Sequence, residues 1–179
     1  MSSSNLIIIY TGNGKGKTSA ALGLALRSLR DNKKVLLIQF IKSNKQSGEV
    51  SLKKILPKLQ IKCFGQGFVY KSQSVKGSRV KDKEITKKGV EFTKKAIKSQ
   101  KYDVIVLDEV LIAIHLKLIP INVIIDLIKQ TRQLGRTFLV LTGRGCPKSL
   151  YAQADLVTEM KEIKHPFSKG ISAIKGIDY

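Results

Sequence analysis

The sequence has little of several features that would assign it to a special class of protein. Only two of its 179 residues are cysteines, Cys63 and Cys146, and their spacing matches no metal-binding or redox motif, so we expect buried, reduced thiols. No stretch approaches the roughly 20 apolar residues that are needed to cross a bilayer. The first four residues lack the basic and apolar segments of a signal peptide. We therefore expect a cytoplasmic protein without a membrane partner.

Acidic residues are also few, because 13 Asp and Glu stand against 33 Lys and Arg, which gives a net charge of +20. Such an excess attracts polyanions, and nucleic acid is the obvious candidate. However, 27 of the 33 basic residues are lysines scattered along the chain, and no basic stripe alternates with aromatic residues, as base stacking would require. We expect a solvated, lysine-rich surface around a site for an anionic small molecule, with no nucleic-acid partner.

Short apolar runs alternate with helical patterns along the whole chain, which at 42% hydrophobic residues can bury a core. Near-continuous apolar runs of this length are typical of parallel strands buried on both faces. The rhythm predicts a single α/β domain over residues 1–179, P-loop NTPase-like, with a mostly parallel central sheet and helices on both faces. Expected strands are Leu6–Tyr10, Val35–Ile41, Ile61–Phe64, Val104–Leu107, Thr137–Leu141 and an edge strand at Val157–Ile163; expected helices are 17–30, 49–57, 85–100, 121–133 and 148–153.

A glycine-rich loop follows the first predicted strand. The segment TGNGKGKT, residues 11–18, satisfies the P-loop pattern at Gly16, Lys17 and Thr18, although Thr11 replaces the first glycine of that pattern. Backbone N–H groups of such a turn converge on phosphate oxygens, and the following helix N-terminus adds positive potential. Lys17 would neutralise phosphate charge and the Thr18 hydroxyl would ligate Mg²⁺. The loop predicts a nucleotide site.

The fourth predicted strand ends at an acid pair, Asp108 and Glu109, where the Walker B acids of a P-loop protein lie. An acid at this position holds Mg²⁺ directly or through water. These two elements leave the chemistry open. A P-loop ATPase that couples hydrolysis to conformational change would use the same parts, with Glu109 orienting water, and a nucleotide-dependent nucleic-acid-binding module is supported by charge alone.

Seven segments of the chain decide between these alternatives. They are IYTGNGKGKTSAALGLALR, VLLIQFIK, GQGFVY, VIVLDE, LTGRGCP, ADLVTEMKEIKHPF and KGIDY. In their order and spacing, from about residue 6 to the C-terminus, they resemble the P-loop family of cob(I)alamin (corrinoid) adenosyltransferases.

The resemblance implies an enzyme with an unusual use of ATP. Co(I) of a reduced corrinoid attacks the ribose C5′ carbon, the adenosylated corrinoid (adenosylcobalamin) forms and triphosphate leaves. The altered loop would then stabilise a departing polyphosphate, with Lys17 in a catalytic role. The implied metal ligands are Thr18 and Glu109, supported by Asp108. The implied ATP-binding residues are Gly12, Asn13, Gly14, Lys15, Gly16, Lys17, Thr18 and Arg144.

The long segment from Gly65 to Asp82 resembles the family's corrinoid loop. There a Phe-x-Trp pair packs under the corrin ring and displaces the lower axial ligand, which makes Co(II) easier to reduce. The matching positions here are Phe68 and Tyr70, which the resemblance implies are catalytic. Replacing Trp by Tyr keeps an aromatic face but reduces its area.

The remaining expectations concern single histidines and the partners. We assign no chemistry to His165, and we expect His115, among Leu and Ile, to be ordinary packing. The family resemblance implies ATP and a cobalamin- or cobinamide-type corrinoid as substrates, Mg²⁺ as cofactor, a flavoprotein electron donor and a homodimer. The chain begins almost directly at the first strand, so a family N-terminal helix covering the active site is expected to be absent or very short.

Overall fold

The computed structural model describes residues 5–43, 48–67, 76–174 and 176–177, and its centre is one six-stranded sheet. The strand order is β3-β2-β4-β5-β1-β6, and every neighbouring pair is parallel. This confirms the predicted α/β class and parallel sheet. The strands are β1 (Ile7–Thr11), β2 (Val35–Gln39), β3 (Leu59–Cys63), β4 (Val104–Asp108), β5 (Phe138–Thr142) and β6 (Leu156–Glu159).

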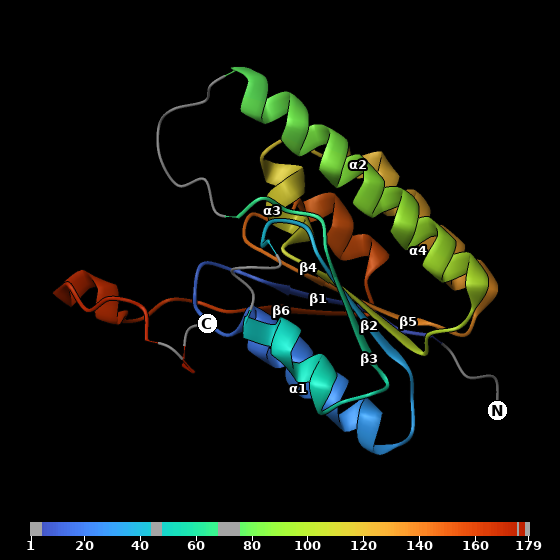
Figure 1. Ribbon diagram of the computed structural model, residues 1–179. Coiled ribbons are helices and arrows are strands. Elements are labelled where there is room, and N and C mark those ends of the chain that lie inside the picture. Colours follow the sequence, from blue (N-terminus) through green and yellow to red (C-terminus); the bar gives the residue numbers. More distant parts are fainter. Residues whose placement is uncertain (1–4, 44–47, 68–75, 175, 178–179) are drawn as a thin grey trace.

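Helices cover both faces of the sheet (Figure 1). The α-helix α1 (Lys17–Arg30) and the 3₁₀ helix η1 (Gly48–Lys54) lie on one face, and α2 (Lys76–Ser99), α3 (Val110–His115) and α4 (Ile121–Leu134) lie on the other. Two shorter 3₁₀ helices, η2 (Lys148–Gln153) and η3 (Pro166–Lys169), precede and follow β6. No helix within the described ranges is long and apolar enough to cross a membrane.

Alternate strand residues enter two separate hydrophobic cores, because successive side chains of a strand point to opposite faces. In β1, Ile7 and Ile9 belong to the core under α2, α3 and α4, whereas Ile8 belongs to the core under α1. Ala21 and Ala25 lie four residues apart on the buried side of α1. Their small side chains let the helix approach the sheet closely and so fix the position of its N-terminus.

Most predicted elements are present, with shifted ends. Helix α2 begins at residue 76, nine residues earlier than predicted, so the end of the expected long loop at 65–82 is helical. Helix α3 was not predicted, because it has only six residues and follows β4 almost directly, which is too short for a helical pattern to stand out. The edge strand β6 ends at Glu159 and not at Ile163. Phe68 and Tyr70 lie outside the described residues.

Parallel strands place all their carboxyl ends at one edge of the sheet, where ligands of open α/β sheets bind. Three segments singled out in the sequence meet there: the glycine-rich loop after β1, the acid pair at the end of β4, and the Thr-Gly-Arg-Gly turn after β5. The fold therefore brings together segments from three separate parts of the chain.

Candidate active site

The glycine-rich loop turns sharply between β1 and α1. Gly12 and Gly16 have φ angles of 99° and 112°, a region that side chains disfavour, and Gly16 is the N-cap of α1. Lys17 is buried, and its Nζ atom donates a hydrogen bond of 2.6 Å to the Gly14 carbonyl. Burial lowers the pKa of the Lys17 ammonium, as does the nearby Arg144, while Glu109 and Asp108 oppose this shift. The lysine is thus held over its own loop, among charges of both signs.

The end of β6 packs directly on this loop. The Gly14 N–H donates to the Met160 carbonyl at 2.8 Å, and the Met160 N–H donates to the Thr11 carbonyl at 2.8 Å. A Cβ atom on Gly14 would lie 2.8 Å from the carbonyl carbon of Lys161 and 2.9 Å from the Met160 oxygen. Glycine at position 14 is therefore required by the contact with β6, a requirement that the motif alone does not reveal.

Asp108, at the end of β4, is fully buried and accepts three side-chain hydrogen bonds. Its Oδ1 atom accepts from the hydroxyls of Thr18 and Thr142, both at 2.8 Å, and its Oδ2 atom accepts from the Gln39 amide at 3.2 Å. Since the Thr18 hydroxyl hydrogen is directed to Asp108, the oxygen of Thr18 keeps its lone pairs for another ligand. Asp108 therefore serves as an anchor for the start of α1.

Glu109 differs from its neighbour in both geometry and electrostatics. It has a left-handed backbone with φ 59° at the start of α3, and its N–H donates to the Thr142 hydroxyl at 2.9 Å. Burial and the Asp108 carboxylate raise the pKa of Glu109 to about 7, against the effect of Lys17, Lys42 and Arg144. Its Oε2 atom is buried without a hydrogen-bond partner in the part of the chain that the structure describes. A buried acceptor without a partner is suited to a cation.

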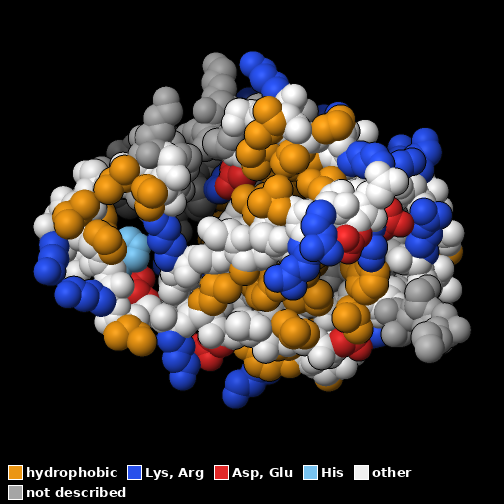
Figure 2. All heavy atoms as spheres, turned by 90° about the horizontal axis from the view of Figure 1, so that it is seen from below, with side chains coloured by type: hydrophobic (Ala, Val, Ile, Leu, Met, Phe, Trp, Pro, Cys, Tyr) orange, Lys and Arg blue, Asp and Glu red, His pale blue; other side chains and the backbone are white. Residues whose placement is uncertain are grey.

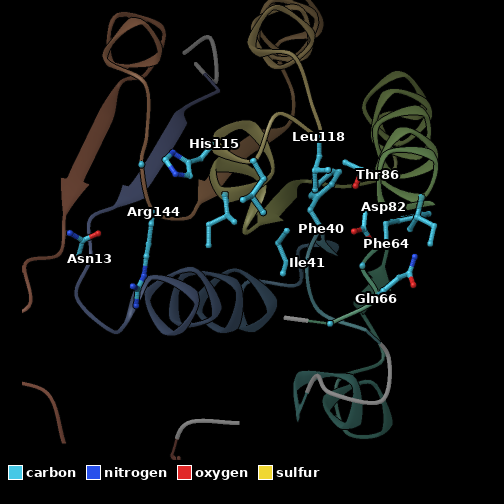
Figure 3. A pocket seen from close by; sticks show the side chains of 16 residues that line it. Asn13, Phe40, Ile41, Phe64, Gln66, Asp82, Thr86, His115, Leu118 and Arg144 are labelled. Atoms are coloured by element: carbon cyan, nitrogen blue, oxygen red, sulfur yellow. The ribbon is translucent and has the colours of Figure 1, made fainter. Parts of the chain in front are cut away.

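Arg144 follows β5 and is exposed. Figure 3 shows its side chain extending toward the beginning of α1. Its charge acts on both Lys17 and Glu109, and within the described residues no carboxylate pairs with it. Arg144 is thus a second cation beside the glycine-rich loop.

A pocket of about 470 Å³ adjoins these charges. Figure 3 shows Asn13, Arg144 and His115 on one side of it and Gln66, Asp82 and Thr86 on the other. The expectation that His115 is ordinary core packing is wrong: it is exposed and lines the pocket, because α3 ends there. The apolar lining comes from Phe40, Ile41, Phe64, Ile85, Ile112, Leu116 and Leu118.

A group of polar residues beside the acid pair was not predicted from the sequence. Gln39 is the last residue of β2, Lys42 follows it closely, and Glu49 belongs to η1. The available signal was a polar residue, Gln39, within the apolar run Val35–Ile41. Cys63 and Cys146 are half-buried thiols, less enclosed than expected.

Comparison with known proteins places this chain in a family. The family model described as ATP:corrinoid adenosyltransferase BtuR/CobO/CobP matches residues 3–179. Among solved structures, the flagellar accessory protein FlaH from Methanocaldococcus jannaschii is similar in fold, with a TM-score of 0.54, covering 87% of this chain and 70% of that chain. At 16% identity, this similarity supports the fold alone.

Curated relatives agree with the family model. The chain is 35% identical to a corrinoid adenosyltransferase from Sinorhizobium sp over 97% of this chain and 80% of the relative. It is 31% identical to one from Escherichia coli (strain K12) and 32% identical to corrinoid adenosyltransferase CobA from Salmonella typhimurium, each over 97% of this chain and 85% of the relative. These matches favour the transferase over a general ATPase or a nucleic-acid-binding module. The chain belongs to the ATP:corrinoid adenosyltransferase family, whose enzymes transfer an adenosyl group from ATP to a corrinoid.

Proposed function

We propose that ATP binds over the glycine-rich loop with its ribose directed at the pocket of about 470 Å³, where the reduced corrinoid binds. Co(I) attacks the ribose C5′ carbon, the C5′–O bond breaks, and triphosphate leaves with the bonding electron pair. The observation that carries this proposal is the continuity of the two sites, since Asn13 of the loop and Arg144 both line the apolar pocket. Nucleophile and electrophile would meet at that boundary.

The leaving group is a polyanion, and the loop supplies its charge stabilisation. Lys17 is the first residue of α1, and the Arg144 side chain extends toward the beginning of that helix. On this proposal, the ATP-binding set also includes residues 12–16 and Thr18, of which Lys15 is exposed. Preorganised charges of this kind contribute most when they face charge that develops in the transition state. The Lys17 ammonium would leave the Gly14 carbonyl to meet phosphate.

We assign Mg²⁺ to the oxygens of Thr18 and Glu109. Mg²⁺ is usually bound through one or two carboxylates together with substrate phosphates. Among the residues described, no group of three His, Cys, Asp or Glu side chains could hold a metal, so the proposed site relies on the phosphates of ATP for the remaining ligands. When bound, the ion would neutralise triphosphate charge. Asp108, whose oxygens already accept three hydrogen bonds, supports Thr18 and does not need to contact the metal.

We further propose that Phe68 and Tyr70 pack under the corrin ring and displace its lower ligand before reduction. The segment that carries them follows Gly67, which lines the pocket. Their action precedes alkylation, so Phe68→Ala should reduce activity strongly when electrons arrive through bound Co(II), and much less when cob(I)alamin is supplied already reduced. An equal loss of activity in both assays would show that these residues only form a binding surface and do not displace the lower ligand.

The family also implies two protein partners, an electron donor and a second copy of the chain. A flavoprotein would supply the electron in the cytoplasm, and one domain over residues 1–179 would act as a homodimer. A second copy would cover apolar side chains of the C-terminal segment, where Ile163 is 97% exposed and Phe167 77% exposed. On the face seen in Figure 2, Lys and Arg side chains are dispersed among apolar ones. This fits a solvated surface better than a nucleic-acid track.

Product analysis tests the proposed chemistry. The protein is incubated anaerobically with ATP, Mg²⁺ and chemically reduced cobalamin, and the nucleotide and corrinoid products are separated. We expect triphosphate and adenosylcobalamin in equal amounts. ADP and phosphate would instead indicate an ATPase, and absence of any product would indicate a binding module.

A further inference from the structure

The amide of Gln39 lies between two carboxylates at the carboxyl edge of the sheet. Its Nε2 atom donates to Asp108 Oδ2 at 3.2 Å and to Glu49 Oε2 at 3.4 Å. Its Oε1 atom accepts from the Cys63 thiol at 3.2 Å. Gln39 is fully buried, and rotating its amide would place an oxygen against both carboxylates. The surrounding groups therefore fix one orientation of this side chain.

Glu49 is also held from its other oxygen. Lys42 Nζ lies 3.0 Å from Glu49 Oε1, and the two side chains are only 15% and 13% exposed. Burial lowers the pKa of the Lys42 ammonium, but Asp108 and Glu49 outweigh it and raise the pKa. Removing one partner of a buried pair is costly because the other charge is left uncompensated. The pair therefore fixes Glu49 and compensates its charge.

These contacts form one continuous chain of polar groups that leads to the P-loop helix. It runs from Lys42 to Glu49, then to Gln39, to Asp108 and finally to Thr18. Glu49 belongs to η1, and in this series of hydrogen bonds it is joined to Asp108 and Thr18 through the Gln39 amide. Mutation of a group that holds a metal ligand in place typically costs about 10–100-fold in metal affinity or activity.

We propose that Glu49 is a positioning residue of the metal and nucleotide site: through Gln39 it orients the Asp108 carboxylate that receives the Thr18 hydroxyl, while Lys42 balances its charge. This inference rests on the proposed assignment of Mg²⁺ to Thr18 and Glu109. Without Glu49, the Gln39 amide loses one of its two acceptors, so one of the three donors that hold the Asp108 carboxylate becomes less constrained. The predicted consequence is weaker metal-dependent binding of ATP.

The test measures ATP binding by calorimetry across a series of Mg²⁺ concentrations, without corrinoid and without turnover. Glu49→Ala should raise the Mg²⁺ concentration that gives half-maximal ATP affinity by roughly tenfold. Glu49→Gln keeps an acceptor for Gln39 and should recover most of that loss. Glu49→Leu fills the same volume and replaces the alanine variant if the latter fails to fold.

Two controls separate positioning from general damage. Asp103→Asn weakens a more exposed carboxylate pair at the opposite edge of the sheet, where Arg136 lies 3.3 Å from the carboxylate. It should lower the melting temperature and leave the Mg²⁺ dependence unchanged. The double variant Lys42→Met/Glu49→Ala removes both charges together, so a defect due only to charge imbalance would disappear in it, whereas a positioning defect persists.

The proposal is overturned if Glu49→Ala shows the same Mg²⁺ dependence as Asp103→Asn, or if the double variant returns to wild-type behaviour. It is also overturned if Glu49→Gln is as impaired as Glu49→Ala. Because the titration needs no corrinoid, its outcome is independent of the product analysis that tests adenosyl transfer.

Discussion

The Thr18 hydroxyl and the Asp108 carboxylate are 90 residues apart in the chain and are joined by a hydrogen bond of 2.8 Å. The glycine-rich loop joins β1 to the helix of Thr18, and β5 lies between β1 and β4, the strand of Asp108. The last residue of β5, Thr142, donates to the same oxygen of Asp108. One carboxylate thus ties the P-loop helix to two neighbouring strand ends.

Asp108→Asn tests the hydrogen bonds that this carboxylate accepts. The asparagine keeps the shape, but its NH₂ group must face either the Gln39 amide or two hydroxyls, so at least one donor loses its acceptor. We expect the free energy of unfolding to fall by roughly 1–3 kcal/mol and ATP binding to weaken. Chemical denaturation measures the first effect and calorimetry the second. An unchanged stability would show that the carboxylate charge is not needed there.

Lys17→Ala tests the leaving-group assignment. It removes a charge that faces the loop and no core contact, so the fold should persist while transfer falls by roughly 100-fold or more. Turnover and circular dichroism are compared with Lys129→Ala, an exposed lysine on α4. Near-normal turnover in folded Lys17→Ala would contradict the role.

Glu109→Gln tests the perturbed carboxyl in metal-free protein. Its pKa in the folded state is about 7, above the ordinary 4.5. Between these values the folded state holds a proton that the unfolded state has lost, so stability decreases as pH rises through this window. The glutamine variant cannot lose a proton at this position, so its free energy of unfolding at about pH 8 should exceed that of the wild type by up to roughly 3 kcal/mol. Urea denaturation in the presence of a chelator, at about pH 5 and about pH 8, measures this difference in stability. The same change in stability with pH in both proteins would contradict the prediction.

Gly14→Ala tests the contact between the loop and the end of β6. The new methyl group would lie 2.8 Å from the Lys161 carbonyl, so backbone must move. We expect a loss of roughly 1–3 kcal/mol in stability together with weaker ATP binding, both measured by thermal shift with and without ATP. The matched control is Gly23→Ala in α1, where a Cβ atom meets nothing within 4 Å and where roughly 0.5–1 kcal/mol of stabilisation is expected.

His115→Ala tests the pocket. Because His115 lies on the pocket wall beside Gly145, we expect a several-fold higher KM for corrinoid with unchanged ATP affinity. His165→Ala serves as the control, since His165 accepts a hydrogen bond from its own η3 helix at the Phe167 N–H. Equal KM values in the two variants would remove His115 from the corrinoid site.

Local patterns predicted the elements and the loop well, because the apolar runs of β1, β2, β4 and β5 are buried on both faces and the P-loop motif is contiguous. The polar chain around Gln39 could not be predicted, since it depends on register between strands: Gln39 lies opposite both Cys63 and Asp108. His115 was misjudged because four apolar residues before it in α3 are buried (Val110, Leu111, Ala113 and Ile114), whereas His115, the last residue of that helix, is exposed. Sequence neighbours do not show which side of a short helix faces a pocket.

The contact between Met160 and the glycine-rich loop also bears on the order of folding. The loop occupies residues 11–18, yet its Gly14 N–H and Thr11 carbonyl form hydrogen bonds with Met160, which is translated nearly 150 residues later. Strand β1 itself lies between β5 and β6. During synthesis, the nucleotide loop leaves the ribosome early and must wait without its partners until almost the whole domain has emerged. The native loop, with both of these hydrogen bonds made, can therefore form only after Met160 has been synthesised, so completion of the nucleotide site depends on a long-range contact made late.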